Sequence, residues 1–508
     1  MAKDLSFYLK YIIIFSIAFI LKDLTADSIN ENKGQTYYEE ALDLAGQTEY
    51  KKAESTFLEA RKEFLKNEDK EKAYQSLLKS RRMHRVTLQY PYSEEEMRKI
   101  LKENYPDVSD DEREAWIKDG KVDFLQMGNE KLYFEDFVKN VAFRNIPLIQ
   151  RYSDMKGQND PFFDEARDII FNSPLSGYPA KAWQPYNNPI KYMLEASLNI
   201  PREKLPINGI LKLWIPVPIQ TAAQFDVRLV SLTPEKYIKM PAQLDSDIGI
   251  VYCEVDMENL KDDLDIKLKA IFSRYTEKFI IDPEKVGDYD KENFIYKRYT
   301  SSQKNIPVNE EFRQKALDIV GLEQNPYLAA KKIYEYILEN IRYSFMPHVT
   351  LDALDIPEPV FVMQNFYGDC GAQSMYFASL CRSIGIPARA SGGMQLFPGI
   401  EGDHFWAEFY LPNYGWVPVD TTIAESSDWT TQITDEERKA FKDFYFGNLD
   451  PYRMVIQNDV DIPLNPIPQE KPILSCAIQF PVVICETTEE DLSEDMDKYW
   501  KINFNVIN

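Results

Sequence analysis

The sequence predicts an α+β protein in which an N-terminal helical region and a β-sandwich-like domain precede a core of mixed helices and strands. Three patterns support this fold class. Apolar residues recur at helical spacing between residues 35 and 80. From residue 210 onward the period changes to two, as in half-buried strands. After Pro307 the helical spacing returns and leads into a strand hairpin.

The chain begins with a segment typical of an export signal. Lys3 and Lys10 accompany an apolar run from Tyr11 to Leu21, which is shorter than the roughly 20 residues that a membrane-spanning helix needs. A plausible cleavage site ends at Ala26, so residues 1–26 are predicted to be a signal peptide. The protein is then expected in the periplasm, at the cell surface or in the medium. The alternative is a buried or interfacial N-terminal helix.

The composition restricts the partners. Lys and Arg number 59 and Asp and Glu number 82, which gives a formal net charge of −23. Such an acidic surface repels nucleic acid and anionic lipid. Nucleic acid is therefore excluded as a main partner, and membrane contact is expected only through the N-terminal signal.

Residues 34–90 are predicted to form a helical hairpin of the tetratricopeptide type. Its apolar positions are Tyr50, Ala53, Phe57, Ala60 and Phe64. Stable arrays of such repeats need about three units, whereas here one clear unit is accompanied by a weaker one around Ala73. The helices are either a docking surface for a protein partner or a helical pair packed on its neighbours.

Residues 91–200 are predicted to be a helical region followed by an irregular connector. Ser93 and Ser109 each precede three acidic residues, a pattern typical of helix N-caps. The stretch from Pro161 to Pro201 is rich in Pro, Asn and Tyr and is expected to lack regular structure.

A β domain is predicted over 205–300, because apolar and polar residues alternate there. The apolar positions are Leu211, Leu213 and Ile215, and later Ile266, Leu268, Ala270 and Phe272. The core is expected over 305–450, where Asn309 and Asn325 can cap two helices. A C-terminal β segment is expected over 451–508.

Cys370 is predicted to lie at the N-terminus of a helix. Gly368 allows a tight turn before it, apolar residues at helical spacing follow it, and Gly385 ends the helix. Unpaired backbone N–H groups and the positive end of the helix dipole favour a thiolate at such a position. The same N–H groups can donate to an oxyanion.

A strand hairpin is predicted to supply a base and a carboxylate. Residues 403–410 alternate as a strand that carries His404, and Gly415 marks the turn before the returning strand. Positions of like parity in an antiparallel hairpin of even register share a face. His404 and Asp420 are therefore expected to lie no more than one diagonal apart, so that Asp420 can fix the imidazole tautomer.

These segments resemble the core of the transglutaminase-like superfamily over about 317–422, with a looser likeness at 446–450. The matching motifs are Gly368-Asp369-Cys370, Leu380 to Arg389, His404-x-Trp406-x-Glu408 and Trp416-x-Pro418-x-Asp420. The resemblance implies a papain-like site with Cys370 as nucleophile, His404 as base and Asp420 as the orienting carboxylate. It also suggests Tyr343, Gly371 and Trp406 for an oxyanion site or pocket. Tyr343 takes the place of the tryptophan that precedes the cysteine in animal cross-linking enzymes.

No metal or other cofactor is expected. The chain has five cysteines and three histidines, without an HExxH motif or a clustered Cys/His set. Cys476 and Cys485 can form a disulfide if they lie on adjacent strands, which the sequence leaves open.

The expected chemistry is attack of the Cys370 thiolate on an amide carbonyl of a protein or peptide, which gives a thioester that water or an amine resolves. Peptide hydrolysis is the preferred interpretation, and protein-glutamine acyl transfer is the alternative. A third interpretation is a surface binding or scaffold protein that retains a vestigial catalytic core.

Overall fold

The computed structural model describes residues 33–156 and 185–507, apart from 475, 486, 487, 489, 490 and 495. The predicted signal peptide and much of the predicted connector lie outside the described residues. The chain divides into two units, the first ending at residue 145 but including residues 347–356, and the second containing the remainder.

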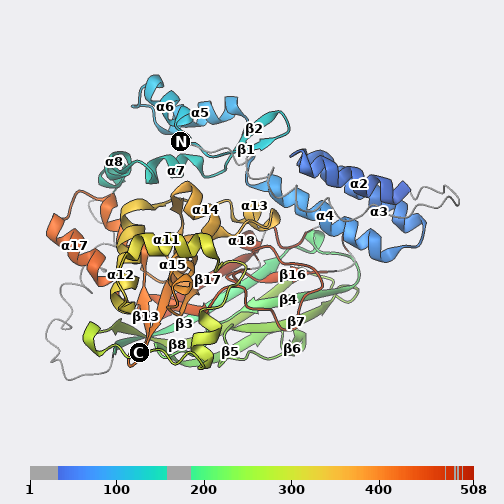
Figure 1. The fold of residues 1–508 in the computed structure, drawn as a ribbon. Helices are drawn as coiled ribbons and strands as arrows, with labels where there is room; N and C mark the ends of the chain where they lie inside the picture. Colours follow the sequence, from blue (N-terminus) through green and yellow to red (C-terminus); the bar gives the residue numbers. More distant parts are fainter. Residues whose placement is uncertain are drawn as a thin grey trace, which may run out of the picture. The chain divides into compact units, whose positions relative to one another are not determined.

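The first unit consists of helices and one short hairpin (Figure 1). Its elements are α2 (Lys33–Gly46), α3 (Tyr50–Lys66), α4 (Lys70–Leu88), α5 (Glu94–Asn104), α6 (Asp110–Lys118), β1 (Phe124–Met127), β2 (Glu130–Tyr133), α7 (Phe137–Phe143) and α13 (His348–Ala353). Ser93 and Ser109 cap α5 and α6 as the sequence predicts, and Ser93 forms a reciprocal capping box with Glu96.

Consecutive packing of α2, α3 and α4 buries the apolar positions predicted for this region. Tyr50, Ala53, Phe57, Ala60 and Phe64 of α3 are all at most 2% exposed. The likeness to tetratricopeptide helices stays a prediction. Helix α13 belongs to this unit although its chain neighbours do not, because Thr350 bonds to the Val86 carbonyl (3.2 Å) and to the Gln89 side chain (3.0 Å).

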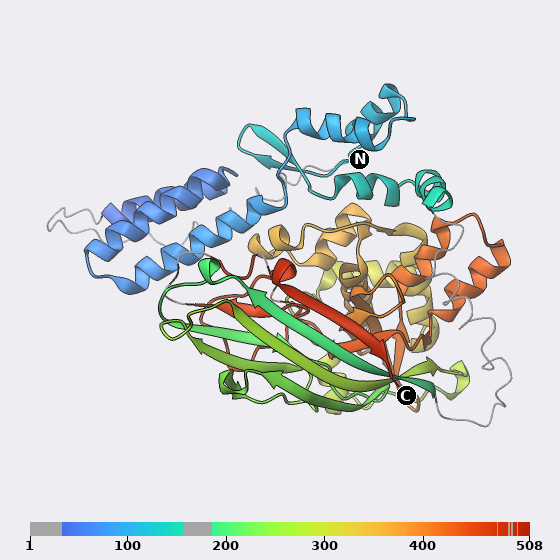
Figure 2. The same ribbon diagram turned by 180° about the vertical axis from the view of Figure 1, so that it is seen from behind.

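The second unit contains a β-sandwich, which confirms this part of the predicted fold. Its strands are β3 (Tyr186–Ile200), β4 (Ile210–Pro216), β5 (Gln224–Thr233), β6 (Ile238–Met240), β7 (Ile250–Asp256), β8 (Leu264–Lys278), β14 (Asn448–Leu449), β16 (Val482–Ile484) and β17 (Trp500–Val506). One sheet has the order β14-β8-β3-β17 with β5 also paired to β8, and the other has the order β16-β4-β7-β6. The predicted inward residues of β4 and β8 share one hydrophobic core. In Figure 2 the red strand β17 lies along its green partner β3.

The prediction of an irregular connector is wrong for its last part, because Tyr186–Ile200 forms the long strand β3. Tyr192, Leu194, Ala196 and Leu198 alternate into the core and are at most 5% exposed. Asn187, Asn188 and Pro189 lie at the start of β3, where the pairing register shifts between Asn187 and Ile190. The Pro and Asn residues therefore indicate a local irregularity at the start of a strand, and not a segment without regular structure.

The core of the second unit is a four-stranded sheet covered by helices. The sheet has the order β13-β12-β11-β15 and is formed by β11 (Ala388–Gln395), β12 (Gly402–Leu411), β13 (Gly415–Val419) and β15 (Arg453–Gln457). Helix α15 (Cys370–Ser383) packs on β11 and β12. The other elements are α8 (Ile146–Lys156), α10 (Phe294–Tyr299), α11 (Glu310–Val320), α12 (Pro326–Asn340), β9 (Arg342–Tyr343), α14 (Glu358–Asn365), β10 (Tyr367–Gly368), α16 (Thr421–Ser426), α17 (Asp435–Phe444) and α18 (Met496–Tyr499).

Local signals for the core helices are confirmed. Asn309 caps α11, Asn325 caps α12, and Gly385 follows α15 with a φ of 84°. The strands of the segment 451–508 belong to three sheets, since β15 pairs with β11, β16 with β4, and β17 with β3.

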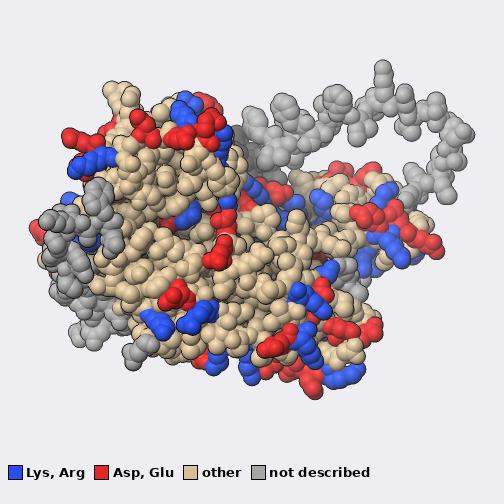
Figure 3. All heavy atoms as spheres, turned by 90° about the horizontal axis from the view of Figure 1, so that it is seen from below, with Lys and Arg blue, Asp and Glu red and all other residues tan. Residues whose placement is uncertain are grey.

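The charged residues are interspersed on the face that Figure 3 shows, where acidic and basic side chains surround a larger uncharged area without a continuous basic tract. No helix in the described part of the chain is long and apolar enough to cross a membrane.

Candidate active site

Cys370 is the first residue of α15. Asp369 precedes it as the N-cap, and its Oδ1 accepts the Ala372 N–H at 3.0 Å. One residue earlier, Gly368 pairs in parallel with Tyr343. A Cβ on Gly368 would lie 2.8 Å from a Val362 methyl group, so only glycine fits this approach to the helix.

The surroundings of the Cys370 sulfur raise its pKa well above the usual value. Desolvation is the main cause, and the negative charge of Asp369 adds to it. The backbone N–H groups of Phe405 and Gly371 act in the opposite direction. The expectation that the helix start favours the thiolate is therefore corrected, because burial and an adjacent carboxylate outweigh the amides. The residue itself remains partly exposed.

His404 and Asp420 are brought together by the predicted hairpin. The register pairs Ala407 with Val419 and continues toward Asp420 opposite Trp406, which places His404 one diagonal away. His404 Nε2 lies 2.7 Å from Asp420 Oδ2, and the two side chains are only 5% and 1% exposed. Since Asp420 occupies Nε2, Nδ1 is the ring nitrogen left for another partner.

Asp420 also begins the next helix. Its Oδ1 accepts the Ile423 N–H at 3.0 Å as the N-cap of α16. Burial alone would raise the pKa of Asp420, but the charges of His404 and Arg453 together with these hydrogen bonds lower it below its usual range. Asp420 is therefore a rigidly held carboxylate.

Arg453 and Asp450 complete this buried cluster. Arg453 Nη1 lies 2.5 Å from Asp420 Oδ2, and Nη2 lies 2.6 Å from Asp450 Oδ2. Both residues are fully buried. The sequence reasoning missed Arg453, because its place depends on the pairing of β15 with β11. One signal in the sequence could have indicated Arg453. It is a charged residue at the start of an otherwise mainly apolar segment, just after the looser family likeness at 446–450.

A β-bulge in the pairing of β11 with β15 determines how closely β15 approaches the site. The register of β11 with β15 shifts between Gly392 and Gly393. A Cβ on Gly393 would lie 1.8 Å from the Met454 carbonyl oxygen, so a side chain there would displace β15 and with it Arg453.

The remaining predicted residues occupy different surroundings. Trp406 is 1% exposed, and the Arg453 guanidinium carbon lies 5.3 Å from the centre of its ring, which is the position of a packing residue. Tyr343 is half-buried and its ring contacts Trp429 at 5.5 Å between centroids. Gly371 contributes its N–H to the sulfur. Tyr343 and Gly371 thus lie beside the start of α15.

Glu408 shares strand parity with His404 but has partners elsewhere. Its Oε2 lies 2.5 Å from Arg389 Nε and 3.0 Å from Ser391 Oγ. These contacts hold β11 to β12 and do not involve the His404–Asp420 pair.

Another buried acid, Glu425, lies close to the start of α15. Glu425 of α16 is fully buried, accepts the Tyr343 N–H at 2.9 Å, and lies 3.3 Å from Gln373 Nε2. Gln373 also donates to the Gly368 carbonyl at 3.1 Å. Burial raises the pKa of Glu425 to about 7. No local pattern in the sequence points to Glu425, since its burial depends on how α16 packs.

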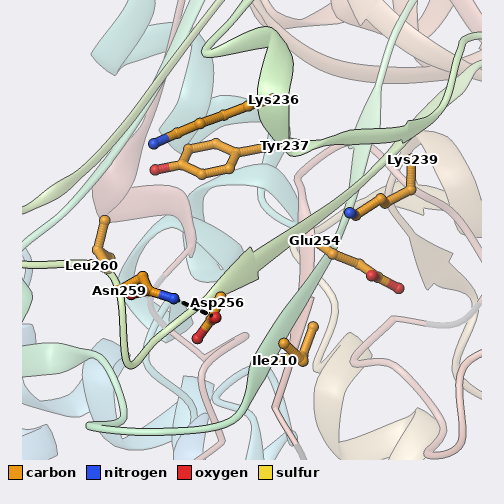
Figure 4. Close-up of a pocket in the computed structure, with 8 residues that line it drawn as sticks. All are labelled: Ile210, Lys236, Tyr237, Lys239, Glu254, Asp256, Asn259 and Leu260. Atoms are coloured by element: carbon orange, nitrogen blue, oxygen red, sulfur yellow. Dashed lines mark hydrogen bonds between the residues drawn. The ribbon is translucent and has the colours of Figure 1, made fainter.

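A surface cavity of about 250 Å³ lies in the β-sandwich and contains none of the predicted site residues (Figure 4). It is lined by Ile210, Lys236, Tyr237, Lys239, Glu254, Asp256, Asn259 and Leu260. Asp256 already bonds to Asn259 at 2.7 Å, and the lysines are exposed, so this cavity does not supply the chemistry of the site.

Comparison with known proteins places the core region in a family. Residues 313–421 match the model of the transglutaminase-like superfamily. An uncharacterized protein of Haemophilus influenzae is 27% identical over 234 residues, which are 41% of this chain and 59% of that protein. The chain therefore spans less than two thirds of that relative's length.

Two solved structures are similar at low identity. A candidate cysteine protease from Cytophaga hutchinsonii has a TM-score of 0.41 at 12% identity, over 63% of this chain and 92% of that chain. The periplasmic domain of TgpA from Pseudomonas aeruginosa has a TM-score of 0.23 at 13% identity, over 50% and 92%. Cys370, His404 and Asp420 all lie within the family match at 313–421, and the chain therefore contains a transglutaminase-like core domain.

Proposed function

We propose that the protein is an exported cysteine hydrolase that cleaves amide bonds of proteins or peptides through a thioester on Cys370. The observation that carries the proposal is the 2.7 Å contact between His404 and Asp420, together with the hydrogen bond from the Phe405 N–H to the sulfur of Cys370 at the start of α15. The family match over these residues supports the reaction class. Export rests on the signal pattern of residues 1–26.

Proton transfer begins the reaction. Asp420 accepts a hydrogen bond from Nε2–H of His404 and so leaves Nδ1 unprotonated to act as the base. The high pKa of the thiol keeps Cys370 neutral until His404 removes its proton as the sulfur attacks the carbonyl carbon. In this proposal the N–H groups of the first residues of α15, Cys370 and Gly371, donate to the oxyanion as it forms.

The tetrahedral intermediate then breaks its C–N bond. The imidazolium gives its proton to the leaving amine, and an acyl thioester remains on the sulfur. Water attacks the thioester with His404 as the base, releasing a carboxylic acid and restoring the thiol. A primary amine in place of water would give acyl transfer.

The test is incubation of the protein with a mixture of unfolded proteins, with and without an added primary amine, followed by mass spectrometry. New peptide termini that disappear in Cys370→Ala support hydrolysis. Amine adducts on glutamine without new termini would establish acyl transfer instead. A folded protein that produces neither would contradict an enzymatic function and leave the scaffold interpretation.

A further inference from the structure

The buried cluster behind His404 contains one more carboxylate than a base and its orienting partner require. Asp420 and Asp450 flank a single guanidinium, that of Arg453, and all three side chains are at most 1% exposed. Arg453 reaches Asp450 through Nε and Nη2 at 2.6–3.2 Å, and reaches Asp420 through Nη1.

The net charge of this cluster decides how well it can stabilise a protonated His404. An arginine beside Asp420 cancels the negative charge that should stabilise the imidazolium formed during the reaction. Two carboxylates and one guanidinium leave the cluster with a net charge of minus one. Asp420 and Arg453 alone would be neutral.

The other polar groups that face the cluster do not change this count. The Tyr445 hydroxyl donates to Asp450 at 3.2 Å, and burial raises the pKa of both Tyr445 and Tyr334, so these phenols stay neutral. Arg274 lies 5.9 Å from the centre of the Trp406 ring and forms its own ion pair with Glu277. Cys370 is held as a neutral thiol.

We propose that Asp450 is an electrostatic positioning residue, which offsets the positive charge of Arg453 so that a net negative charge remains beside His404 to stabilise its imidazolium. The proposal rests on the proposed function, in which His404 accepts a proton from Cys370. Arg453 then holds the Asp420 carboxylate in position, and Asp450 compensates the positive charge that Arg453 brings close to His404.

A charge series tests the proposal without any substrate. The chain has only three histidines, so His404 can be followed by NMR of histidine-labelled protein. A Cys370→Ala background removes coupling to the thiol. Asp450→Asn makes the cluster neutral and should move the midpoint of the His404 titration about one unit to lower pH. Arg453→Gln leaves two negative charges and should move the midpoint to higher pH.

The double variant Asp450→Asn with Arg453→Gln separates charge from structure. It restores a net charge of minus one and should return the midpoint toward that of the parent, although it removes more contacts than either single variant. A parent-like midpoint in a folded Asp450→Asn protein would overturn the proposal, as would a double variant shifted further than Asp450→Asn. If Asp450→Asn does not fold, Arg453→Gln and the double variant still show in which direction the charge of the cluster shifts the His404 midpoint.

Turnover distinguishes this inference from the proposed function. With an active substrate, Asp450→Asn should lower kcat about tenfold at neutral pH, and the double variant should recover most of that loss. Absence of turnover in the parent would contradict the hydrolase proposal and leave the titration series valid. Turnover with an unshifted His404 titration would contradict only the role of Asp450.

Discussion

Cys370 and Cys381 lie on the same helix and differ in what surrounds them. Cys370 is partly exposed at the first position of α15, whereas Cys381 is fully buried near the end of the helix. Cys370→Ala should abolish turnover, because it removes the nucleophile. Cys381→Ala should retain turnover and cost on the order of 1 kcal/mol in unfolding free energy. Activity assays and thermal melting of both variants check this, and full activity in Cys370→Ala would exclude the mechanism.

Asp420→Asn separates the charge of the orienting group from its shape. Asparagine can still accept the Ile423 N–H that caps α16, but it cannot stabilise an imidazolium and can present an amide N–H to His404. Turnover should fall roughly ten- to a thousand-fold, less than for a serine nucleophile, because a thiol is more acidic than a hydroxyl. Turnover measured well below the melting temperature tests this. Unchanged turnover would mean that Asp420 is not the third member of the site.

Asp369 provides the opposite kind of test, since its charge opposes the reactive thiolate. Asp369→Asn should preserve the cap on Ala372 while lowering the pKa of Cys370. Alkylation by iodoacetamide at pH 7 should therefore become up to about tenfold faster. Asp262→Asn, an exposed change in the β-sandwich, is the matched control. A slower reaction in Asp369→Asn would show that the cap matters more than the charge.

At the scale of elements, Glu425 connects α16, α15 and strand β9. Burial raises its pKa to about 7, from 4.5 in an unfolded chain. The folded state thus binds the proton more tightly, and the unfolding free energy should be highest below pH 4.5, fall as pH rises to about 7, and then level off. The protonated carboxyl can donate to Gln373 Oε1, which has no other partner among the described residues.

Glu425→Gln should remove this dependence, which amounts to about 3 kcal/mol at most. Chemical denaturation at pH 5 and pH 7.5 measures it, with exposed Glu436→Gln as the control. Burial also raises the pKa of Glu277 to about 7, so Glu425→Gln keeps the part of the slope that Glu277 contributes, and only the difference between the parent and the variant belongs to Glu425. Equal slopes in the parent and in Glu425→Gln would contradict the assignment.

Elements with strong local signals were predictable from the sequence. The start of α15, its end at Gly385 and the diagonal between His404 and Asp420 all follow from neighbouring residues. The contact of Arg453 with Asp420 depends instead on strand pairing between segments about sixty residues apart in the chain. The thiol's raised pKa depends on desolvation by packed neighbours, which no local pattern encodes.

At the scale of the molecule, the first unit should lose its structure as one body that includes residues 347–356. Val86 is fully buried, and its carbonyl accepts from Thr350 of α13. Val86→Ala should destabilise this unit by about 2 kcal/mol. Hydrogen exchange should then accelerate in α4 and α13 together, while α14 and α15 keep their protection. If α13 exchanged in step with α14 instead, the division of the chain into these two units would be wrong.

Residues 347–356 belong to the first unit although the chain on both sides of them belongs to the second, and this limits how the gene can recombine. The main chain passes between the two units three times, near residues 145, 346 and 356. A recombination event that cut the gene at the first crossing would remove helix α4, on which α13 packs. An exchange of residues up to 145 alone would therefore separate α13 from the unit to which it belongs, so residues 347–356 would have to change together with that segment.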